Sequence, residues 1–403
     1  MEKKKLVVNC AVCDARNVTE STLKSYEKIE INAASVFVSK EAKEIFSLYN
    51  VSINAADINE IPQDVEVMVQ NGAFELSETT VISRPAVLVV NGSLNIKNGA
   101  QNALGKIISI LVNGQVSYPS NLQDYLPSIK VNGSTDSYPH DAIRLKNKLI
   151  IDNPFIIKAK ESAKYYVKNK VVIPDETLNI SKLAGKGVSF ITKKAIIAEN
   201  LLEAALPLFN EDADTVVIPA GYSYIAGGKL DDVLIRKHGD KLYVDGDFIV
   251  TLENSNALEK ITSIRVNGAV LIVENLMDKL NAIDAEYENI KTIKGTLIED
   301  KGILSIDKRM LESNEHGITV SDCGVVKLKD DITPEDIEKK LQFTDCGCIF
   351  CNEEQKSSVE LVSEDVGQIV DNNNESGFLK GIIGGSDLYN NETQVINAAN
   401  YTM

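Results

Sequence analysis

Cysteine is the residue type in this sequence best suited to metal or redox chemistry, and the six cysteines lie at its two ends. Cys10 and Cys13 form a Cys-x-x-Cys pair, and no cysteine follows before Cys323. Thiolates two residues apart can share a Zn²⁺ ion, so either group could supply half of a tetrahedral site. The residues that this reasoning predicts as metal ligands are Cys346, Cys348, Cys351 and Cys323.

The same cysteines have two other interpretations. Cys10, Cys323 and Cys346 occupy or adjoin the bend of a repeat described below, where a thiol can act as a small apolar filler. Redox or intermolecular thiol chemistry is the third alternative. Zinc is therefore the one cofactor that these residues suggest, and a zinc site predicts about one bound equivalent per chain. No other cofactor is expected.

The remaining polar residues form no recognisable catalytic motif. The three histidines, His140, His238 and His316, have no nucleophile beside them in the sequence, and no Gly-x-Ser-x-Gly motif is present. The glycine pairs lack the spacing of a phosphate-binding loop or of a dinucleotide fingerprint. We therefore predict no catalytic residue and a protein that is not an enzyme.

Charge and hydropathy restrict the partners. The chain has 403 residues and a net charge of -16, which argues against binding to nucleic acid or to anionic lipid. The basic start at residues 3–5 precedes too few apolar residues for a signal peptide, and no run is long enough for a membrane helix. We expect a cytoplasmic protein with a protein partner or with itself as partner, and leaderless export stays open.

Asparagine recurs at the end of short apolar strands. Successive positions lie about 20 residues apart, and Asn-Gly or Asn-Ala suits a tight bend because Asn and Gly tolerate left-handed backbone conformations. Stacked strands would align these side chains in a column whose amides hydrogen-bond to one another. The predicted column comprises Asn9, Asn32, Asn54, Asn71, Asn91, Asn113, Asn132 and Asn267.

Each repeat consists of an apolar strand, a bend, a second extended piece and a return segment. Several return segments, at 19–26, 39–48, 201–208 and 273–283, predict short helices, two of them opened by the capping residues Thr19 and Ser39. Stacking such units pairs strand with strand, so the pattern predicts a repeat solenoid with a parallel β-sheet of about sixteen rungs. The Asn-Gly bends could alternatively close hairpins.

The period and the strand-then-return layout resemble those of leucine-rich repeats, over roughly residues 6–350. Residues 110–122 carry the resemblance, with an apolar strand followed by Asn, Pro and Leu. The sequence departs from that family because Val and Ile dominate and Asn follows the strand directly, which would equally suit a β-solenoid decorated with helices. The resemblance implies a parallel α/β solenoid that binds protein partners on its sheet face.

Three regions follow from the clarity of the repeat. Residues 1–170 carry clear Asn-Gly repeats, residues 171–351 carry degenerate ones, and residues 352–403 form a polar tail that we expect to be mostly mobile. The apolar segment 377–385 within the tail could fold back as a cap on the last rung. It could instead dock on a partner's sheet edge.

These observations predict a scaffold or a protein-interaction solenoid. One alternative is a structural protein that assembles by stacking end to end, since open sheet ends invite pairing and the first strand begins at Leu6 without a polar cap. A second alternative is a cysteine-based metal-binding or redox protein.

Overall fold

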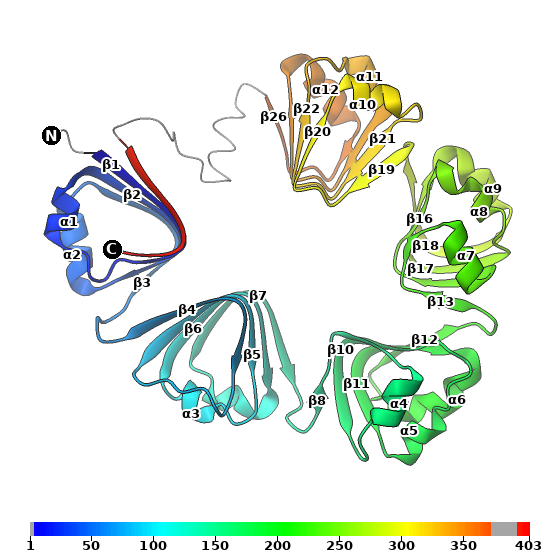
Figure 1. Ribbon diagram of the computed structural model, residues 1–403, viewed down its shortest axis with the longest axis horizontal. Coiled ribbons are helices and arrows are strands. Elements are labelled where there is room, and N and C mark those ends of the chain that lie inside the picture. Colours follow the sequence, from blue (N-terminus) through cyan, green and yellow to red (C-terminus); the bar gives the residue numbers. More distant parts are fainter. Residues whose placement is uncertain (1–3, 372–392) are drawn as a thin grey trace. The chain divides into compact units, whose positions relative to one another are not determined.

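The computed structural model describes residues 4–371 and 393–403, and this part of the chain consists mostly of parallel β-strands joined by short helices (Figure 1). The chain divides into two compact units. The first comprises Met1–Arg144 with Leu379–Met403, and the second comprises Leu145–Phe378. The division thus falls at residues 144/145, whereas the repeat pattern placed a boundary at 170/171.

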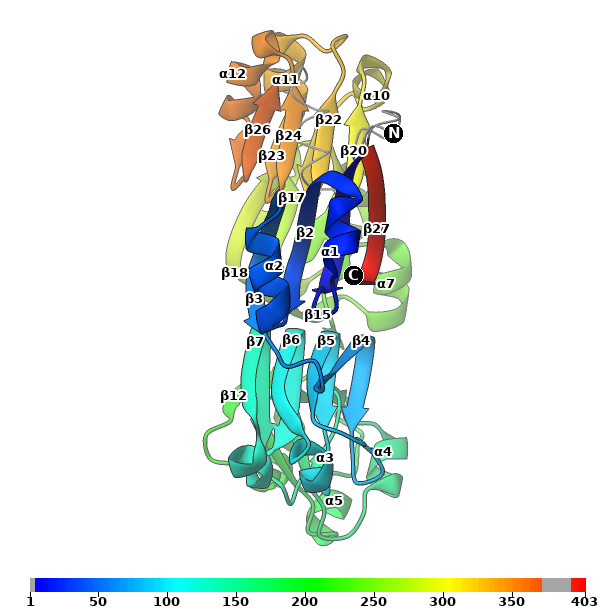
Figure 2. The same ribbon diagram turned by 90° about the vertical axis from the view of Figure 1, so that its left-hand side faces the viewer.

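The first unit contains two four-stranded parallel sheets. The first sheet has the order β27-β1-β2-β3, as Figure 2 shows, and the second has the order β4-β5-β6-β7. The elements are β1 (Lys4–Asp14), α1 (Glu20–Lys24), β2 (Tyr26–Val38), α2 (Lys40–Ser47), β3 (Val51–Glu60), β4 (Glu66–Leu76), β5 (Ala86–Ile96), α3 (Gln101–Leu104), β6 (Ile107–Pro119), the 3-10 helix η1 (Ser120–Tyr125), β7 (Ser128–Tyr138), β8 (Ile143–Arg144) and β27 (Thr393–Thr402).

The second unit begins with two groups of strands. In the third sheet, β10 lies between β9 and β11, and β12 follows β11; in the fourth, β17 pairs with β15, β16 and β18. The elements are β9 (Lys148–Ile150), α4 (Asn153–Lys158), β10 (Lys164–Ile173), α5 (Ser181–Gly185), β11 (Ser189–Ala198), η2 (Glu199–Leu201), α6 (Leu202–Ala205), η3 (Leu206–Leu208), β12 (Asp214–Ile218), β13 (Ser223–Ile225), β14 (Gly228–Lys229), α7 (Asp232–His238), β15 (Lys241–Asp245), β16 (Phe248–Val250), η4 (Leu252–Asn254), α8 (Ser255–Leu258), β17 (Ser263–Val273), η5 (Glu274–Leu276), α9 (Met277–Asn281) and β18 (Asp284–Ile293).

The second unit ends with two further four-stranded parallel sheets. Their orders are β19-β21-β23-β25 and β20-β22-β24-β26. The elements are β19 (Thr296–Glu299), β20 (Ile303–Ile306), α10 (Lys308–Ser313), β21 (Ile318–Ser321), β22 (Val325–Leu328), α11 (Pro334–Lys340), β23 (Leu341–Thr344), β24 (Cys348–Cys351), α12 (Glu353–Leu361), β25 (Ser363–Glu364) and β26 (Gln368–Asp371).

Local sequence explains the bends and the helix starts. Thr19 and Ser39 cap α1 and α2 by accepting hydrogen bonds from backbone N–H groups three residues on, as their sequence context predicts. Asp322 and Asp345 take positive φ angles of 51° and 54°, in the two Asp-Cys-Gly bends. Asp is among the few residues other than Gly that tolerate this left-handed region.

The repeat pattern predicted one continuous sheet of about sixteen rungs, and the strands do not form such a sheet. They are divided among several sheets, and each group of strands encloses its own apolar core. The connections that follow β3, β7 and β12 contain Pro62, Pro139 and Pro219, and the one after β18 contains Gly295. Pairing stops at these connections, but Pro85 and Pro174 lie in connections between strands that do pair, so a proline alone does not end a sheet.

The segment after residue 351 is also different from the predicted tail. Residues 353–371 form α12, β25 and β26, because Asn352 and Gln355 build a capping box and β24 offers an edge for one further strand. Residues 377–385, interpreted above as a cap or docking peptide, lie outside the described residues. The strand that does cover a sheet edge is β27, further along the chain.

Candidate functional site

The edge of the first sheet formed by β1 is occupied by a strand from the other end of the sequence. β27 pairs with β1 in parallel, and Lys5 to Asp14 align with Thr393 to Thr402. The two strands belong to the same compact unit although more than three hundred residues separate them. This edge therefore accepts an added strand that is not its neighbour in the sequence.

The added strand continues the side-chain columns of the sheet. Ile396 aligns with Val8, which aligns in turn with Ile31 of β2, and Ala398 aligns with Cys10. Val8 and Ile31 are fully buried, and Ile396 packs against the same core. β27 therefore contributes an inward apolar side chain at the position where the other strands of the sheet do so.

The amide side chains of this sheet form a hydrogen-bonded ladder. The Nδ2 atom of each Asn donates to the Oδ1 atom of the next, from Asn54 to Asn32 at 2.8 Å, from Asn32 to Asn9 at 2.9 Å, and from Asn9 to Asn397 at 2.8 Å. The four residues align in register. All donors point in one direction along the sheet, from β3 toward β27.

The other asparagines of the predicted column lie in two places. In the second sheet, Asn113 donates to Asn91 at 2.9 Å, and Asn91 donates to Asn71 at 3.0 Å. Asn132 aligns with Asn113 on the neighbouring strand. Asn267 of β17 donates instead to Asp245 at 3.4 Å. The column is thus divided among three sheets.

Sequence reasoning missed Asn397, and a signal was present. The tetrapeptide Ile-Asn-Ala-Ala occurs at 31–34 in β2, at 53–56 in β3 and at 396–399 in β27. The third copy lies in the segment that composition assigned to a polar tail, which concealed it. Because identical residues occupy equivalent places in the sheet, a search for this tetrapeptide would have predicted that residues 396–399 form a strand of such a sheet.

Further contacts hold both ends of β27. Tyr26 of β2 donates its hydroxyl to the side-chain oxygen of Gln394 at 3.2 Å, and the backbone N–H of Met403 donates to the carbonyl of Asp14 at 2.9 Å. Tyr401 and Met403 pack against the core of the first sheet. Burial raises the pKa of Tyr401, and the neighbouring Tyr26 adds to the effect.

The Cys-x-x-Cys pair lies on β1 itself. Cys13 is fully buried, and Cys10 is partly exposed. A hydrogen bond between the two thiols lowers the pKa of Cys10 and raises that of Cys13, and burial raises the pKa of Cys13 further. The pair contributes to the packing under β1.

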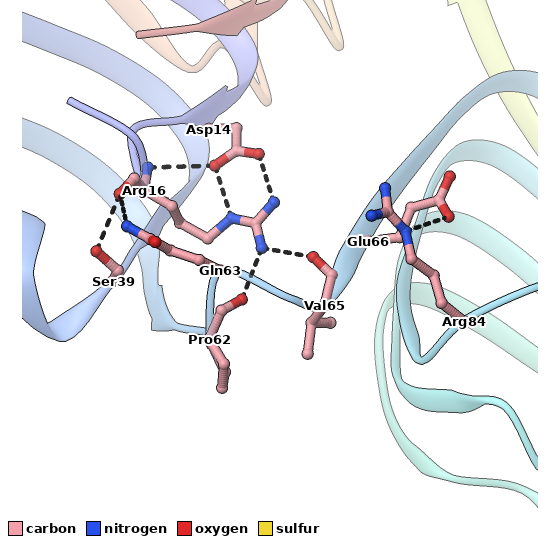
Figure 3. Close-up of polar contacts among 8 residues, drawn as sticks. All are labelled: Asp14, Arg16, Ser39, Pro62, Gln63, Val65, Glu66 and Arg84. Carbon is pink, nitrogen blue, oxygen red and sulfur yellow. Dashed lines mark hydrogen bonds and ion pairs between the residues drawn. The ribbon is translucent and has the colours of Figure 1, made fainter.

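Arg16 fixes the far end of the same edge, as Figure 3 shows. Its guanidinium group makes a two-bond contact with the carboxylate of Asp14, both distances being 2.8 Å. It also donates to the carbonyls of Pro62 at 2.9 Å and of Val65 at 2.6 Å, in the connection between β3 and β4. The residue is 6% exposed. Arg16 therefore ties the end of β1 to the start of the second sheet.

The four cysteines predicted to bind zinc lie in or beside strands of the last two sheets. Cys323, Cys346, Cys348 and Cys351 are all buried free thiols. Burial raises the pKa of Cys346 and Cys348, and it raises the pKa of Cys351 to about 11. A raised pKa disfavours the thiolate that a metal needs. Within residues 4–371 and 393–403, no three His, Cys, Asp or Glu side chains are grouped to hold a metal ion. The zinc site stays a prediction that metal analysis can test.

The second unit contains a cavity of about 450 Å³ whose lining includes Ser313, Glu315 and His316. These residue types could form a nucleophile and a base. The hydroxyl of Ser313, however, donates to the carbonyl of Arg309 at 2.9 Å, which is a local helix contact. The arrangement therefore gives no support for a hydrolytic site.

Asp245 is a buried carboxylate of the second unit with several side-chain donors. Its side chain is 1% exposed and accepts bonds from Lys170 at 2.7 Å, Tyr224 at 2.6 Å and Lys148 at 3.2 Å. The lysines come from the third sheet, whereas Asp245 and Tyr224 come from the fourth. The cluster therefore joins two sheets. Burial is the main reason that the pKa of the neighbouring Tyr243 is raised to about 12, and the negative charge of Asp245 adds to the effect.

The contacts of Asp245 predict that the second unit loses stability at acid pH. Burial raises the pKa of Asp245, but the bonds from Lys170 and Tyr224 outweigh it and leave the pKa below its ordinary value. The stabilisation is therefore complete above the ordinary Asp pKa and is lost as pH falls through the lower, folded-state value. We expect Asp245→Asn to cost about 2 kcal/mol at neutral pH and to flatten the acid limb of an unfolding-against-pH profile. An unchanged acid limb would contradict this assignment.

Among the described residues, no helix has the length and apolar character needed to cross a membrane. Comparison with known proteins gives no assignment, since no protein-family model, curated protein or solved structure matches the chain.

Proposed function

We propose that this protein is a non-enzymatic interaction scaffold that recruits protein segments by adding strands to its sheet edges. The observation that carries the proposal is the seating of β27 on β1, in the register of a neighbouring repeat. Strand addition is a general mode of peptide recognition, in which backbone bonds supply affinity and side-chain pockets supply specificity. The acidic chain, at a net charge of -16, favours protein partners over nucleic acid.

The bound strand indicates the chemistry of a ligand. Thr393–Thr402 contains no charged residue, places Ile396 toward the core, and offers Asn397 to the amide of Asn9. A ligand for this edge is therefore an extended, uncharged segment with an apolar residue, Asn and a small residue in succession. In the finer architecture that we propose, each group of strands is a short solenoid segment whose end strands expose such edges.

The test uses the full-length chain carrying Ile396→Asp, which places a charge against the apolar core and should release its own β27. We expect a labelled peptide of residues 393–403 to bind this variant with a dissociation constant on the order of micromolar, which corresponds to a binding free energy of about −8 kcal/mol. Binding to the unmodified chain should be at least about tenfold weaker, since its β1 edge is already occupied. Fluorescence anisotropy measures both values.

Two peptide variants serve as controls. A peptide with Ile396→Asp should not bind, whereas one with Val395→Asp should bind nearly as well. Val395 aligns with Val7 and, beyond it, with the charged Glu30, so this position tolerates a polar side chain. Equal binding of both variants, or absence of binding by the unmodified peptide, would refute strand addition at β1.

A further inference from the structure

The first sheet has two open ends that complement each other. Its end strands are β27 and β3, of ten residues each. At one end, Asn397 accepts a bond from Asn9, and its own Nδ2 group makes no hydrogen bond within the described residues. At the other end, Asn54 donates to Asn32, and its Oδ1 atom accepts no bond there. One end thus presents an unused donor and the other an unused acceptor.

We propose that a second copy of this chain binds at these ends, with β27 of one copy lying parallel to β3 of the next. Asn397 would then donate to Asn54 of the neighbouring copy, and the amide ladder would continue with unchanged polarity. This inference rests on the proposed function, since it names the partner that the sheet edges recruit. The contact joins different surfaces of the two copies, so it generates a ring or an open chain of subunits.

The residues along both edges favour this partner. Both strands contain Ile-Asn-Ala-Ala, so the new pair would repeat the alignment of β2 with β3, where the same tetrapeptides lie side by side. Asn54 and Asn397 are both exposed, whereas Asn9 and Asn32 inside the ladder are partly buried. The side chains that would meet are therefore accessible and have an existing counterpart within the sheet.

β27 also lacks the features that normally protect an edge strand. Proteins prevent edge pairing with Lys, other charged residues or Pro, and β27 contains none of these. β3 carries Asp57 and Glu60, but Asp57 is engaged in an ion pair with Lys130 of β7. The uncharged edge of β27 therefore meets β3 without placing like charges opposite each other in the ladder.

The decisive variant is Asn397→Asp in the full-length chain. A carboxylate still accepts the bond from Asn9, so β27 keeps its place, but the outward donor is lost and an acceptor would face the acceptor of Asn54. We expect the association constant between copies to fall at least tenfold, measured by sedimentation velocity. Hydrogen exchange of the β1 amides checks the seating, because a chain that retains β27 should protect these amides as well as the unmodified protein does.

The matched control is Thr393→Asp, which adds the same charge at the first residue of β27, beside Lys5. It should assemble like the unmodified chain. Association should strengthen with added salt, because each copy carries a net charge of -16 that salt screens. When mixed with the unmodified chain, Asn397→Asp should shorten the assemblies, since it retains the β3 edge and cannot extend beyond β27.

Three results would overturn the inference. These are a monomeric unmodified chain at all concentrations, assembly of Asn397→Asp equal to that of the unmodified chain, and loss of assembly in Thr393→Asp to the same extent. If the peptide binds the Ile396→Asp chain while the unmodified protein stays monomeric, strand addition stands and only self-assembly fails. If the peptide does not bind, the proposed function itself fails.

Discussion

Replacing Gly114 by alanine should destabilise the second sheet by about 3 kcal/mol or more. Gly114 lies at the bend of β6 with a φ angle of 141°, and a Cβ atom there would lie 2.0 Å from the carbonyl oxygen of Gly92 on the preceding strand. The obstacle is backbone within a paired sheet, so it cannot rotate away. Relief requires breaking the pairing of β5 with β6.

Gly72 provides the matched control for this prediction. It occupies the same column on β4, has a φ angle of 93°, and has no atom within 4 Å of a Cβ position. Gly72→Ala therefore introduces backbone strain of about 1–2 kcal/mol without the collision. Hydrogen exchange of β5 and β6 amides measures the local effect, which suits a chain with several separate cores. Equal losses in the two variants would show that the collision is relieved elsewhere.

The second large effect is expected from Arg16→Ala. The substitution removes the guanidinium donor from the carboxylate of Asp14 and from the carbonyls of Pro62 and Val65, in a site where the arginine is only 6% exposed. Removing one partner of a buried ion pair typically costs 3–5 kcal/mol. The side-chain bond to Asp14 raises the pKa of Arg16, so the positive charge is present throughout the accessible pH range.

Arg84, which Figure 3 also shows, provides the control for this prediction. Arg84 forms an ion pair with Glu66 at 3.1 Å, but its side chain is 62% exposed. Exposed pairs contribute about 1 kcal/mol or less, so Arg84→Ala should change stability little. Denaturant unfolding of both variants gives the comparison. A loss for Arg16→Ala no larger than that for Arg84→Ala would mean that Arg16 is not essential to the junction between the two sheets.

Local features of the fold follow directly from the sequence. Thr19 and Ser39 predict the starts of α1 and α2, since a cap depends on residues a few positions apart. The sequence placed the asparagines at strand ends, whereas in the structure the strands continue through them, as β5 does through Asn91. Parallel pairing follows from the regular return of the strand, which brings each one beside its predecessor. The aligned asparagines follow from that pairing, because strands paired in register place like residues in one column.

The points at which the sheet is interrupted are harder to predict from the sequence. Pro62, Pro139 and Pro219 are visible in the sequence, but a proline in a return segment is ordinary in repeat proteins, and only its position between complete groups of strands makes it a break. The buried contacts of Arg16 have no local signature either. Two of its partners are carbonyl groups about fifty residues away, and any residue type would supply them.

The pairing of β27 with β1 depended on the tertiary structure for a physical reason. A strand edge selects its neighbour by backbone bonds and by a few side chains, and neither requires proximity along the chain. The third Ile-Asn-Ala-Ala in the sequence indicates that residues 396–399 can form a strand of such a sheet. It does not state which edge lies open, because that depends on where pairing begins and stops. Folding of the first sheet leaves the β1 edge unpaired by its neighbours in the sequence, and β27 occupies it.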